Sequence, residues 1–245
     1  YRCPPGPYER ACVVADYLKR RTAVGSTKKR RKGFKPARVL VLDANASIVA
    51  EPANFGRAFS ERYAQVLEYR PNAEVYSIDS AAGQVVTSQG TFQGRVVNLI
   101  PAQKAGKIVF DAGLVNDPTG RWALVDPLSY ASTAQSDIHV LGDSQGTGQP
   151  KSGHMASSEA KVCADAIIRA FNGLDPDPAP TTNSACYSPI SSTLASWLTA
   201  SYRYDSASRT MKRVEEAFGE ATSPSAENFH EMFHWADNIF ADSFG

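Results

Sequence analysis

The sequence predicts an α/β fold. Apolar residues recur at helical spacing over residues 8–21, and residues 38–43 (RVLVLD) form a continuous apolar run that is typical of a buried parallel strand. A second helix and a second strand follow over residues 55–69 and 74–79. Helices that alternate with strands in this way are the pattern of α/β domains.

The composition is that of a folded globular chain. Its 245 residues are 42% hydrophobic and 21% charged, which is ordinary for a globular protein. The formal net charge of +1 excludes a global field that would draw the chain to nucleic acid. No apolar run approaches the ~20 residues that a membrane-spanning helix requires. We therefore expect neither a nucleic-acid partner nor a membrane span.

Each element of the first half has a local signal. Prolines at positions 4, 5 and 7 make a stiff entry to the first helix. The basic run at residues 28–32 (KKRRK) has no interleaved aromatic residues, so we interpret it as a solvated connection. After the strand at 74–79, turn residues at Gln89-Gly90 predict a hairpin over residues 83–97.

The best-defined site architecture lies in the second half. A short strand at residues 137–141 (DIHVL) ends at Gly142-Asp143, and a helix over about residues 157–171 follows the glycine-containing loop. The N-terminus of such a helix favours an anionic ligand because its N–H groups point out of the helix. We therefore expect a ligand at this loop.

A boundary follows that helix. Asn172-Gly173 is a helix-stop signal, and the proline-rich segment at residues 175–180 is a stiff linker. The remaining residues form a smaller unit that ends in an amphipathic helix near residues 226–240.

The four cysteines fall into two kinds. Cys12 and Cys163 lie in apolar helical patterns, where a free cysteine behaves as a small buried hydrophobe. Cys3 and Cys186 are flanked by Pro, Ser, Asn or Gly, so we expect them in loops, where reactive or paired cysteines are more common. Four cysteines allow three full pairings, and their spacing does not choose among them.

A zinc-binding alternative arises at the C-terminal helix. His230, Glu231 and His234 match the H-E-x-x-H pattern, which places two imidazoles on one helix face beside a general base. Catalytic zinc needs a third protein ligand, and the residues after His234 include no His, Cys or Glu. We therefore favour a plain amphipathic helix and expect no metal, with a zinc hydrolase kept as a remote alternative.

Four motifs resemble the flavoprotein subunit of flavocytochrome c sulfide dehydrogenase. They occur in order along nearly the whole chain, and CPPGPYER is a specific string. The motifs are RCPPGPYER at residues 2–10, GD at 142–143 with PKSG at 150–153, NSACYS at 183–188, and a terminal W followed by DSFG within 235–245.

This resemblance implies a domain organisation. Residues 1–98 would form a Rossmann-like dinucleotide-binding region, 99–178 the returning part of an FAD-binding domain, and 179–245 a small α+β C-terminal domain. The first FAD-binding βαβ unit of the family has no counterpart here, and the chain opens like the middle of a domain. We therefore expect a missing N-terminal FAD-binding segment. The alternative is a non-catalytic flavoprotein-like fragment that serves as an interaction module and binds no flavin.

The resemblance also implies an activity. Cys3 and Cys186 would form a redox disulfide beside FAD, with Glu9 as a proton-handling carboxylate and Trp235 as a wall of the sulfide pocket. Hydrosulfide would be oxidised in the periplasm, and the electrons would leave to a c-type cytochrome subunit. Cys3 suits this chemistry because it stands directly before a helix, where N–H groups favour the thiolate.

The same resemblance implies the FAD-binding residues. Asp143, after Gly142, would accept hydrogen bonds from the ribityl hydroxyls, and Lys151 would place positive charge where reduced flavin accumulates negative charge. Ser152 and Gly153 complete this set of cofactor-binding residues.

Overall fold

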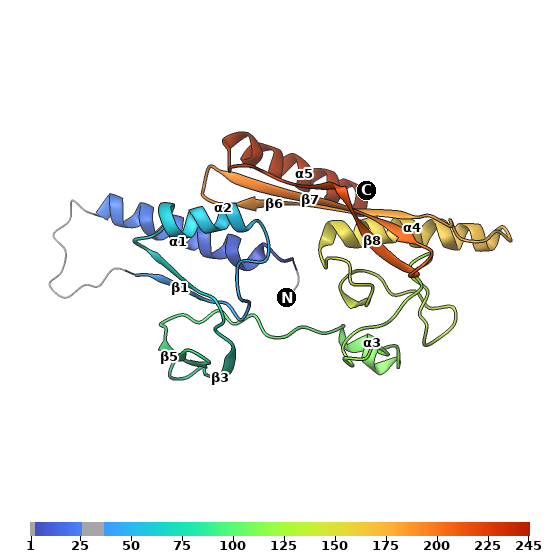
Figure 1. Ribbon diagram of the computed structural model, residues 1–245, viewed down its shortest axis with the longest axis horizontal. Coiled ribbons are helices and arrows are strands. Elements are labelled where there is room, and N and C mark those ends of the chain that lie inside the picture. Colours follow the sequence, from blue (N-terminus) through green and yellow to red (C-terminus); the bar gives the residue numbers. More distant parts are fainter. Residues whose placement is uncertain (1–2, 26–36) are drawn as a thin grey trace.

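The computed structural model describes residues 3–25 and 37–245, and the basic run predicted at residues 28–32 lies outside the described residues. The described part is a mixed α/β structure with one parallel and two antiparallel sheets (Figure 1). Its elements are α1 (Gly6–Gly25), β1 (Val39–Leu42), α2 (Pro52–Arg57), the π-helix η1 (Ala58–Arg62), β2 (Leu67–Arg70), β3 (Val75–Asp79), β4 (Gln84–Thr87), β5 (Gly90–Gln93), α3 (Lys107–Asp111), the 3-10 turn η2 (Gly142–Ser144), α4 (Gly153–Phe171), β6 (Thr181–Pro189), β7 (Ala195–Asp205), β8 (Thr210–Glu220) and α5 (Ala226–Phe244).

The first region is a small parallel sheet packed against helices. Strand β1 pairs with β2 in parallel, with Val39 opposite Leu67. A buried aromatic cluster joins α1, α2 and η1, with the rings of Tyr8 and Phe55 5.5 Å apart between centroids. The predicted helix at residues 8–21 and the predicted parallel strand at 38–43 are confirmed. The strand is not fully buried, because the sheet has only two strands and Leu40 is 39% exposed.

The helix predicted over residues 55–69 is wrong in its second half. The helical segment ends at Arg62, and residues 67–70 form β2 instead. The cause is non-local, because the backbone of β2 is held by the ladder to β1, which no local pattern reveals.

The middle of the chain is mostly loop around one hairpin. Strands β3, β4 and β5 form an antiparallel meander, which confirms the predicted strand at 74–79 and the hairpin that follows it. The strand predicted at residues 137–141 is wrong. His139 makes only an isolated bridge to Ala131, and Asp137 has a left-handed φ of 61° that breaks an extended run.

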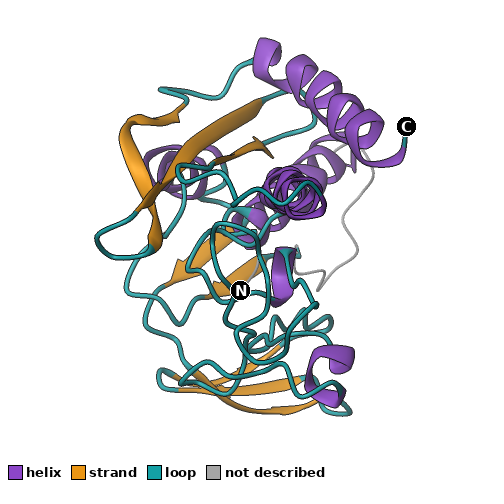
Figure 2. Ribbon diagram, turned by 90° about the vertical axis from the view of Figure 1, so that its right-hand side faces the viewer, coloured by secondary structure: helices purple, strands orange, loops and turns teal. Residues whose placement is uncertain are grey.

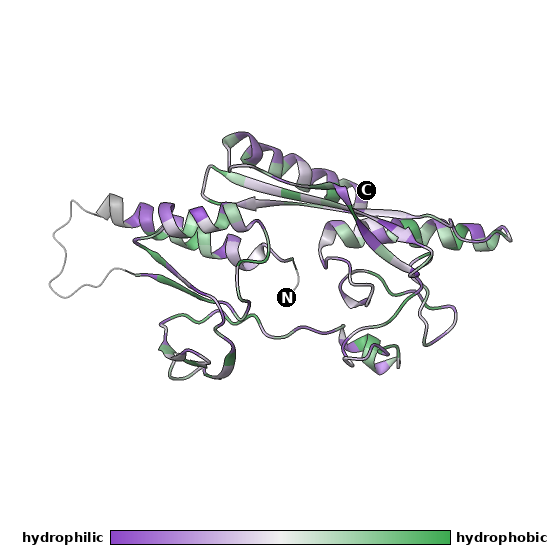
Figure 3. Ribbon diagram, in the orientation of Figure 1, coloured by the Kyte–Doolittle hydropathy of each residue, from purple (hydrophilic) through white to green (hydrophobic). Residues whose placement is uncertain are grey.

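Helix α4 begins four residues before the predicted start. Ser152 caps it, because its Oγ accepts a hydrogen bond from the Met155 N–H at 3.2 Å. Its end at Asn172-Gly173 is as predicted. Helices α3 and α4 share a second buried cluster, and Figure 3 shows hydrophobic residues along both.

The C-terminal unit is a three-stranded antiparallel sheet with α5 along one side (Figure 2). Strand β6 packs against the helices of both preceding regions, because it contacts α1 as well as α4. Cys186 lies in the middle of β6, so the prediction that it sits in a loop is wrong. Within the described residues, no helix combines the length and the apolar character needed to cross a membrane.

Buried polar bonds join the C-terminal unit to the first region. The Tyr63 hydroxyl donates to the Ile190 carbonyl at 2.6 Å, and the Asn54 Nδ2 donates to the Ala221 carbonyl at 2.6 Å. Tyr63 and Asn54 are essentially inaccessible to solvent. The first bond fixes the end of β6 and the second fixes the segment after β8 against the first region.

We predict that Tyr63→Phe lowers the free energy of unfolding by about 1–3 kcal/mol, because it leaves the buried Ile190 carbonyl without its donor. Urea unfolding followed by circular dichroism measures the change. Tyr17→Phe is the matched control, since the Tyr17 side chain is 48% exposed. Equal stability of Tyr63→Phe and the unaltered protein would contradict the role of this bond.

Candidate functional site

Two cysteines from opposite ends of the chain meet in this structure. Cys3 lies in the turn before α1, and Cys186 lies in β6. Their side chains are within hydrogen-bonding reach of each other, and both are free thiols. The Cys3 N–H donates to the Lys151 carbonyl at 2.8 Å, so the segment before α4 holds the turn that carries Cys3.

The two thiols differ strongly in acidity. The hydrogen bond from Cys186 lowers the pKa of Cys3 to about 7, with a further contribution from the Gly6 N–H. Burial and the nearby Asp143 carboxylate act against this lowering. The pKa of Cys186 is raised, chiefly because it shares its proton with Cys3 and because it is buried. Cys3 is therefore the thiolate of the pair.

Glu9 lies one turn into α1, close enough to both sulfurs for their charges to interact. Its carboxylate is half-buried, and its Oε1 accepts from the Ser188 Oγ at 3.2 Å. Burial, followed by the charge of Cys3, raises the pKa of Glu9 to about 8. The site therefore pairs a thiolate with a carboxyl group that can take up a proton near neutral pH.

Gly142 and Asp143 form a tight turn beside the sulfurs. Gly142 has a left-handed φ of 67°, and an added Cβ would approach Ala156 Cβ to 3.2 Å, so glycine is needed here. The Gly142 N–H donates to Glu159 Oε2 at 2.6 Å. Asp143 is half-buried, and its negative charge disfavours the thiolate of Cys3. The turn and the thiol pair thus belong to one site.

Lys151, Ser152 and Gly153 lead from this turn into α4. The Lys151 ammonium lies 4.2 Å from the centroid of the Trp122 ring and donates to the Gln145 carbonyl. Ser152 Oγ lies 3.0 Å from Ser184 Oγ, which links the start of α4 to β6. Gly153 is the first residue of α4, and an added Cβ there would meet nothing within 4 Å.

The structure does not bring Trp235 to the thiol pair. The Trp235 ring lies 5.8 Å from the Tyr187 ring, and its Nε1 donates to His154 at 3.4 Å. Side chains alternate along β6, so Tyr187 points to the face opposite Cys186. Trp235 instead helps to line a groove of about 580 Å³ between α5, β6 and α4.

The H-E-x-x-H residues lie on α5, where Glu231 and His234 line the same groove as Trp235. His230, Glu231 and His234 are all solvent-exposed. Among residues 3–25 and 37–245, no group of three or more His, Cys, Asp or Glu side chains is placed to hold a metal ion. The zinc-hydrolase alternative therefore has no support in this part of the chain.

Cys12 and Cys163 are buried in helices, as predicted. Burial raises the pKa of both thiols, that of Cys12 to about 12. They are packing residues and lie outside the thiol pair.

Three polar residues of the site were not predicted from the sequence. Ser188 and Glu51 extend the contacts of Glu9, and Glu159 accepts from both Gly142 and Gln145. Burial raises the pKa of Glu159 to about 7. The pattern that could have identified Ser188 is the alternation with Cys186 along one strand, which required β6 to be recognised first.

Comparisons with known proteins identify a class of flavoprotein. A family model described as "Sulfide dehydrogenase [flavocytochrome c] flavoprotein chain, central" matches residues 1–101. A second, described as "Flavocytochrome c sulphide dehydrogenase, flavin-binding", matches residues 178–244. The chain therefore belongs to the flavocytochrome c sulfide dehydrogenase flavoprotein family and contains that family's flavin-binding domain.

The fold is similar to that of a solved structure. It is a chain of a cryo-EM structure of the Tetrahymena thermophila mitochondrial ATP synthase (F1Fo composite tetramer), with a TM-score of 0.57 and 14% sequence identity. The match covers 77% of this chain and 45% of that chain. At this level of identity the likeness concerns the fold alone.

We predict that Cys3 is the reactive thiol of the reduced protein. Its alkylation by iodoacetamide should reach half its maximal rate near pH 7, because the hydrogen bond from Cys186 stabilises the thiolate. Cys186→Ala removes that donor and should move the midpoint toward the ordinary thiol value of about 9. Mass spectrometry of the Cys3 peptide gives the rates.

Two further variants separate the causes. Cys186→Ser keeps a donor and should shift the Cys3 midpoint less than Cys186→Ala does. Cys163→Ala, which changes a buried thiol elsewhere, should leave the midpoint unchanged. The same midpoint in Cys186→Ala and the unaltered protein would refute the assignment.

Proposed function

We propose that this chain is the sulfide-oxidising part of a periplasmic, FAD-dependent flavoprotein that passes electrons to a c-type cytochrome subunit. The observation that carries this proposal is the contact between Cys3 and Cys186 next to the Gly142-Asp143 turn. Membership of the sulfide dehydrogenase family supports the substrate and the cytochrome partner.

The domain boundaries follow the same proposal. Residues 1–98 correspond to a Rossmann-like region, 99–178 to the returning part of an FAD-binding domain, and 179–245 to the C-terminal domain. The matched ranges of 1–101 and 178–244 support a division of this kind.

The oxidised form of the thiol pair is a disulfide. Joining the two sulfurs releases two electrons and one proton, that of Cys186, because Cys3 is already a thiolate. Hydrosulfide then attacks one sulfur, and the other leaves as a thiolate. A thiol of lower pKa leaves faster, and the pKa of Cys3 is lowered whereas that of Cys186 is raised. Attack therefore falls on Cys186, which becomes a persulfide, while Cys3 leaves as the thiolate and holds the electron pair of the broken bond.

Glu9 handles the proton of this step. The sulfur of hydrosulfide carries one proton, which becomes more acidic when that sulfur joins Cys186. The Glu9 carboxylate lies near both cysteines, and its pKa of about 8 lies close to neutral pH, where proton acceptors are most effective.

The residues at Gly142-Asp143 fit a flavin cofactor. The turn positions a half-buried carboxylate near the Cys3 sulfur, and the N-terminus of α4 follows closely in the chain. Asp143 would hold the hydroxyl-bearing part of FAD, with Gly142, Lys151, Ser152 and Gly153 around it. Bound FAD supplies an acceptor for two electrons, which thiol chemistry alone does not.

We expect sulfide to bleach the visible flavin band of the protein when it is purified with the partner that accompanies it. Cys3→Ser and Cys186→Ser should each slow bleaching by at least about 100-fold, since neither variant can form the disulfide. Cys163→Ala is the control and should bleach at the normal rate.

Acid quenching followed by mass spectrometry tests the direction of attack. After brief exposure of the oxidised protein to sulfide, the extra sulfur atom should appear on the Cys186 peptide. Recovery of that sulfur on the Cys3 peptide would reverse the assignment. Normal bleaching by Cys186→Ser would reject the proposed chemistry.

A further inference from the structure

Glu51 is a buried carboxylate that the chemistry above does not use. It stands immediately before α2, with a left-handed φ of 47°, and it is 2% exposed. Its Oε2 has no hydrogen-bond partner among the described residues. An ionised carboxylate is costly to bury with an unpartnered oxygen, so this position favours a carboxyl group that carries a proton.

Ser188 connects Glu51 to Glu9. Its Oγ lies 3.2 Å from Glu9 Oε1 and is also in hydrogen-bond contact with Glu51 Oε1. The Ser188 side chain is completely buried. Two carboxyl groups, one from α1 and one from the start of α2, therefore meet at a single hydroxyl group on β6.

Counting protons limits the charge states of this cluster. A serine hydroxyl has one proton to donate and two lone pairs to accept with. It can donate to only one of the two carboxylates. If both were ionised, the second carboxylate oxygen would face a lone pair of Ser188. A favourable contact on both sides requires one carboxyl group to be protonated and to donate to Ser188, which in turn donates to the other.

We propose that Glu9, Ser188 and Glu51 share one dissociable proton, and that Glu51 is the positioning residue through which Glu9 returns its proton to solvent. The inference rests on the proposed function for the source of the proton. The geometry that carries it is the two-sided contact of one buried hydroxyl group together with the unpartnered Oε2 of Glu51.

The proton balance of the step is complete. Hydrosulfide and the disulfide, with one negative charge in total, give the Cys186 persulfide anion, the Cys3 thiolate and one proton. Ionised Glu9 takes this proton. Protonated Glu51 holds its own proton on Oε1 toward Ser188; its carboxyl group turns so that the protonated oxygen faces away from Ser188, and it releases that proton to solvent water. Ser188 then reverses its hydrogen bonds and passes the proton from Glu9 to Glu51. The cluster returns to its starting state after one proton has crossed it.

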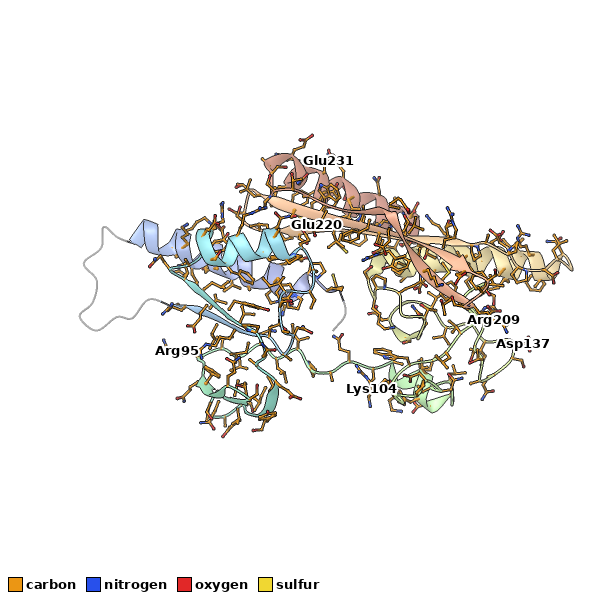
Figure 4. All side chains as sticks on the ribbon, in the orientation of Figure 1. Arg95, Lys104, Asp137, Arg209, Glu220 and Glu231 are labelled. Carbon is orange, nitrogen blue, oxygen red and sulfur yellow. The ribbon has the colours of Figure 1, made fainter. Side chains whose placement is uncertain are left out.

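The charged and titratable groups around Glu51 favour one retained proton. Glu9 and Cys12 face it from α1, and Glu220 faces it from the end of β8 (labelled in Figure 4). All three are acids, so their negative forms oppose a charge on Glu51. The polar side chains of Ser188, Ser196 and Asn54 favour that charge, but burial is the largest influence and raises the pKa of Glu51. Arg57 of α2 directs its guanidinium to the oxygens of Asn54 and Thr222. Glu220 is half-buried, so it marks the solvent side of the cluster.

Infrared spectroscopy of the purified holoprotein counts the shared proton without any turnover. At neutral pH, Glu51→Gln and Glu9→Gln should each remove one protonated-carboxyl band, because the glutamine amide donates to Ser188 and the remaining carboxylate ionises. The double variant should remove no more than either single variant. Loss of two bands in the double variant, or survival of the full band in Glu51→Gln, would overturn the shared proton.

Turnover tests the direction of transfer. Glu51→Gln keeps the shape and the hydrogen bond, so it should fold normally, yet sulfide-driven reduction should fall about 10- to 100-fold with little change in KM. Its pH profile should shift to lower pH, because the charge of Glu51 no longer raises the pKa of Glu9. Ser188→Ala should be slowed similarly.

Ser191→Ala is the matched control, since Ser191 is a buried serine in the turn after β6 whose Oγ accepts only from the Thr193 N–H among the bonds given for it. It should keep normal turnover. Full turnover and an unchanged pH profile in Glu51→Gln would overturn the relay alone. An unaltered protein that fails to react with sulfide would overturn the proposed function, and the infrared count would still decide whether the proton is shared.

Discussion

The packing of β6 between α1 and α4 is the constraint on which the site depends. One edge of the C-terminal sheet carries Cys186 to Cys3 at the start of α1, and the same strand binds the cap of α4 through Ser184 and Ser152. The strand adds to the backbone bond between Cys3 and Lys151, which also holds the thiol turn to the segment before α4. The buried bond from Tyr63 to Ile190 secures the strand just beyond Pro189.

Burial raises the pKa of each acid in this site, but a hydrogen bond reverses the outcome for one of them. Low polarity raises the pKa of Glu9 and Glu51 because it disfavours their charged forms. The pKa of Cys186 is raised first by its hydrogen bond to Cys3 and then by burial. The pKa of Cys3 is lowered instead, because the hydrogen bond donated by Cys186 outweighs the effect of burial. The result is a single thiolate beside acids whose charged forms are disfavoured by burial. Such an arrangement limits the negative charge in the buried cluster.

Local sequence patterns located the three long helices but not the strands β2 and β6 that organise the site. Apolar spacing and stop signals located α1, α4 and α5, because helical hydrogen bonds are local. Strand β2 was predicted as helix, since its ladder to β1 comes from residues far away in the chain. The importance of Cys3 was predicted from the motif around it. Glu51 belongs to no motif, and its proposed role depends on its tertiary contact with Ser188.

The alternation of side chains along β6 makes the number of residues in this strand chemically important. Cys186 and Ser188 face α1, while Ala185 and Tyr187 face the groove beneath α5. The β6–β7 register, with Pro189 opposite Ala195, holds these two sets apart. Because the period of a strand is two residues, gaining or losing one residue between Thr181 and Cys186 would exchange the faces. The sulfur would then point at Trp235. A gained residue would place Ala185 opposite Cys3, and a lost residue would place Tyr187 there, so the site requires the length of this strand as strictly as its residues.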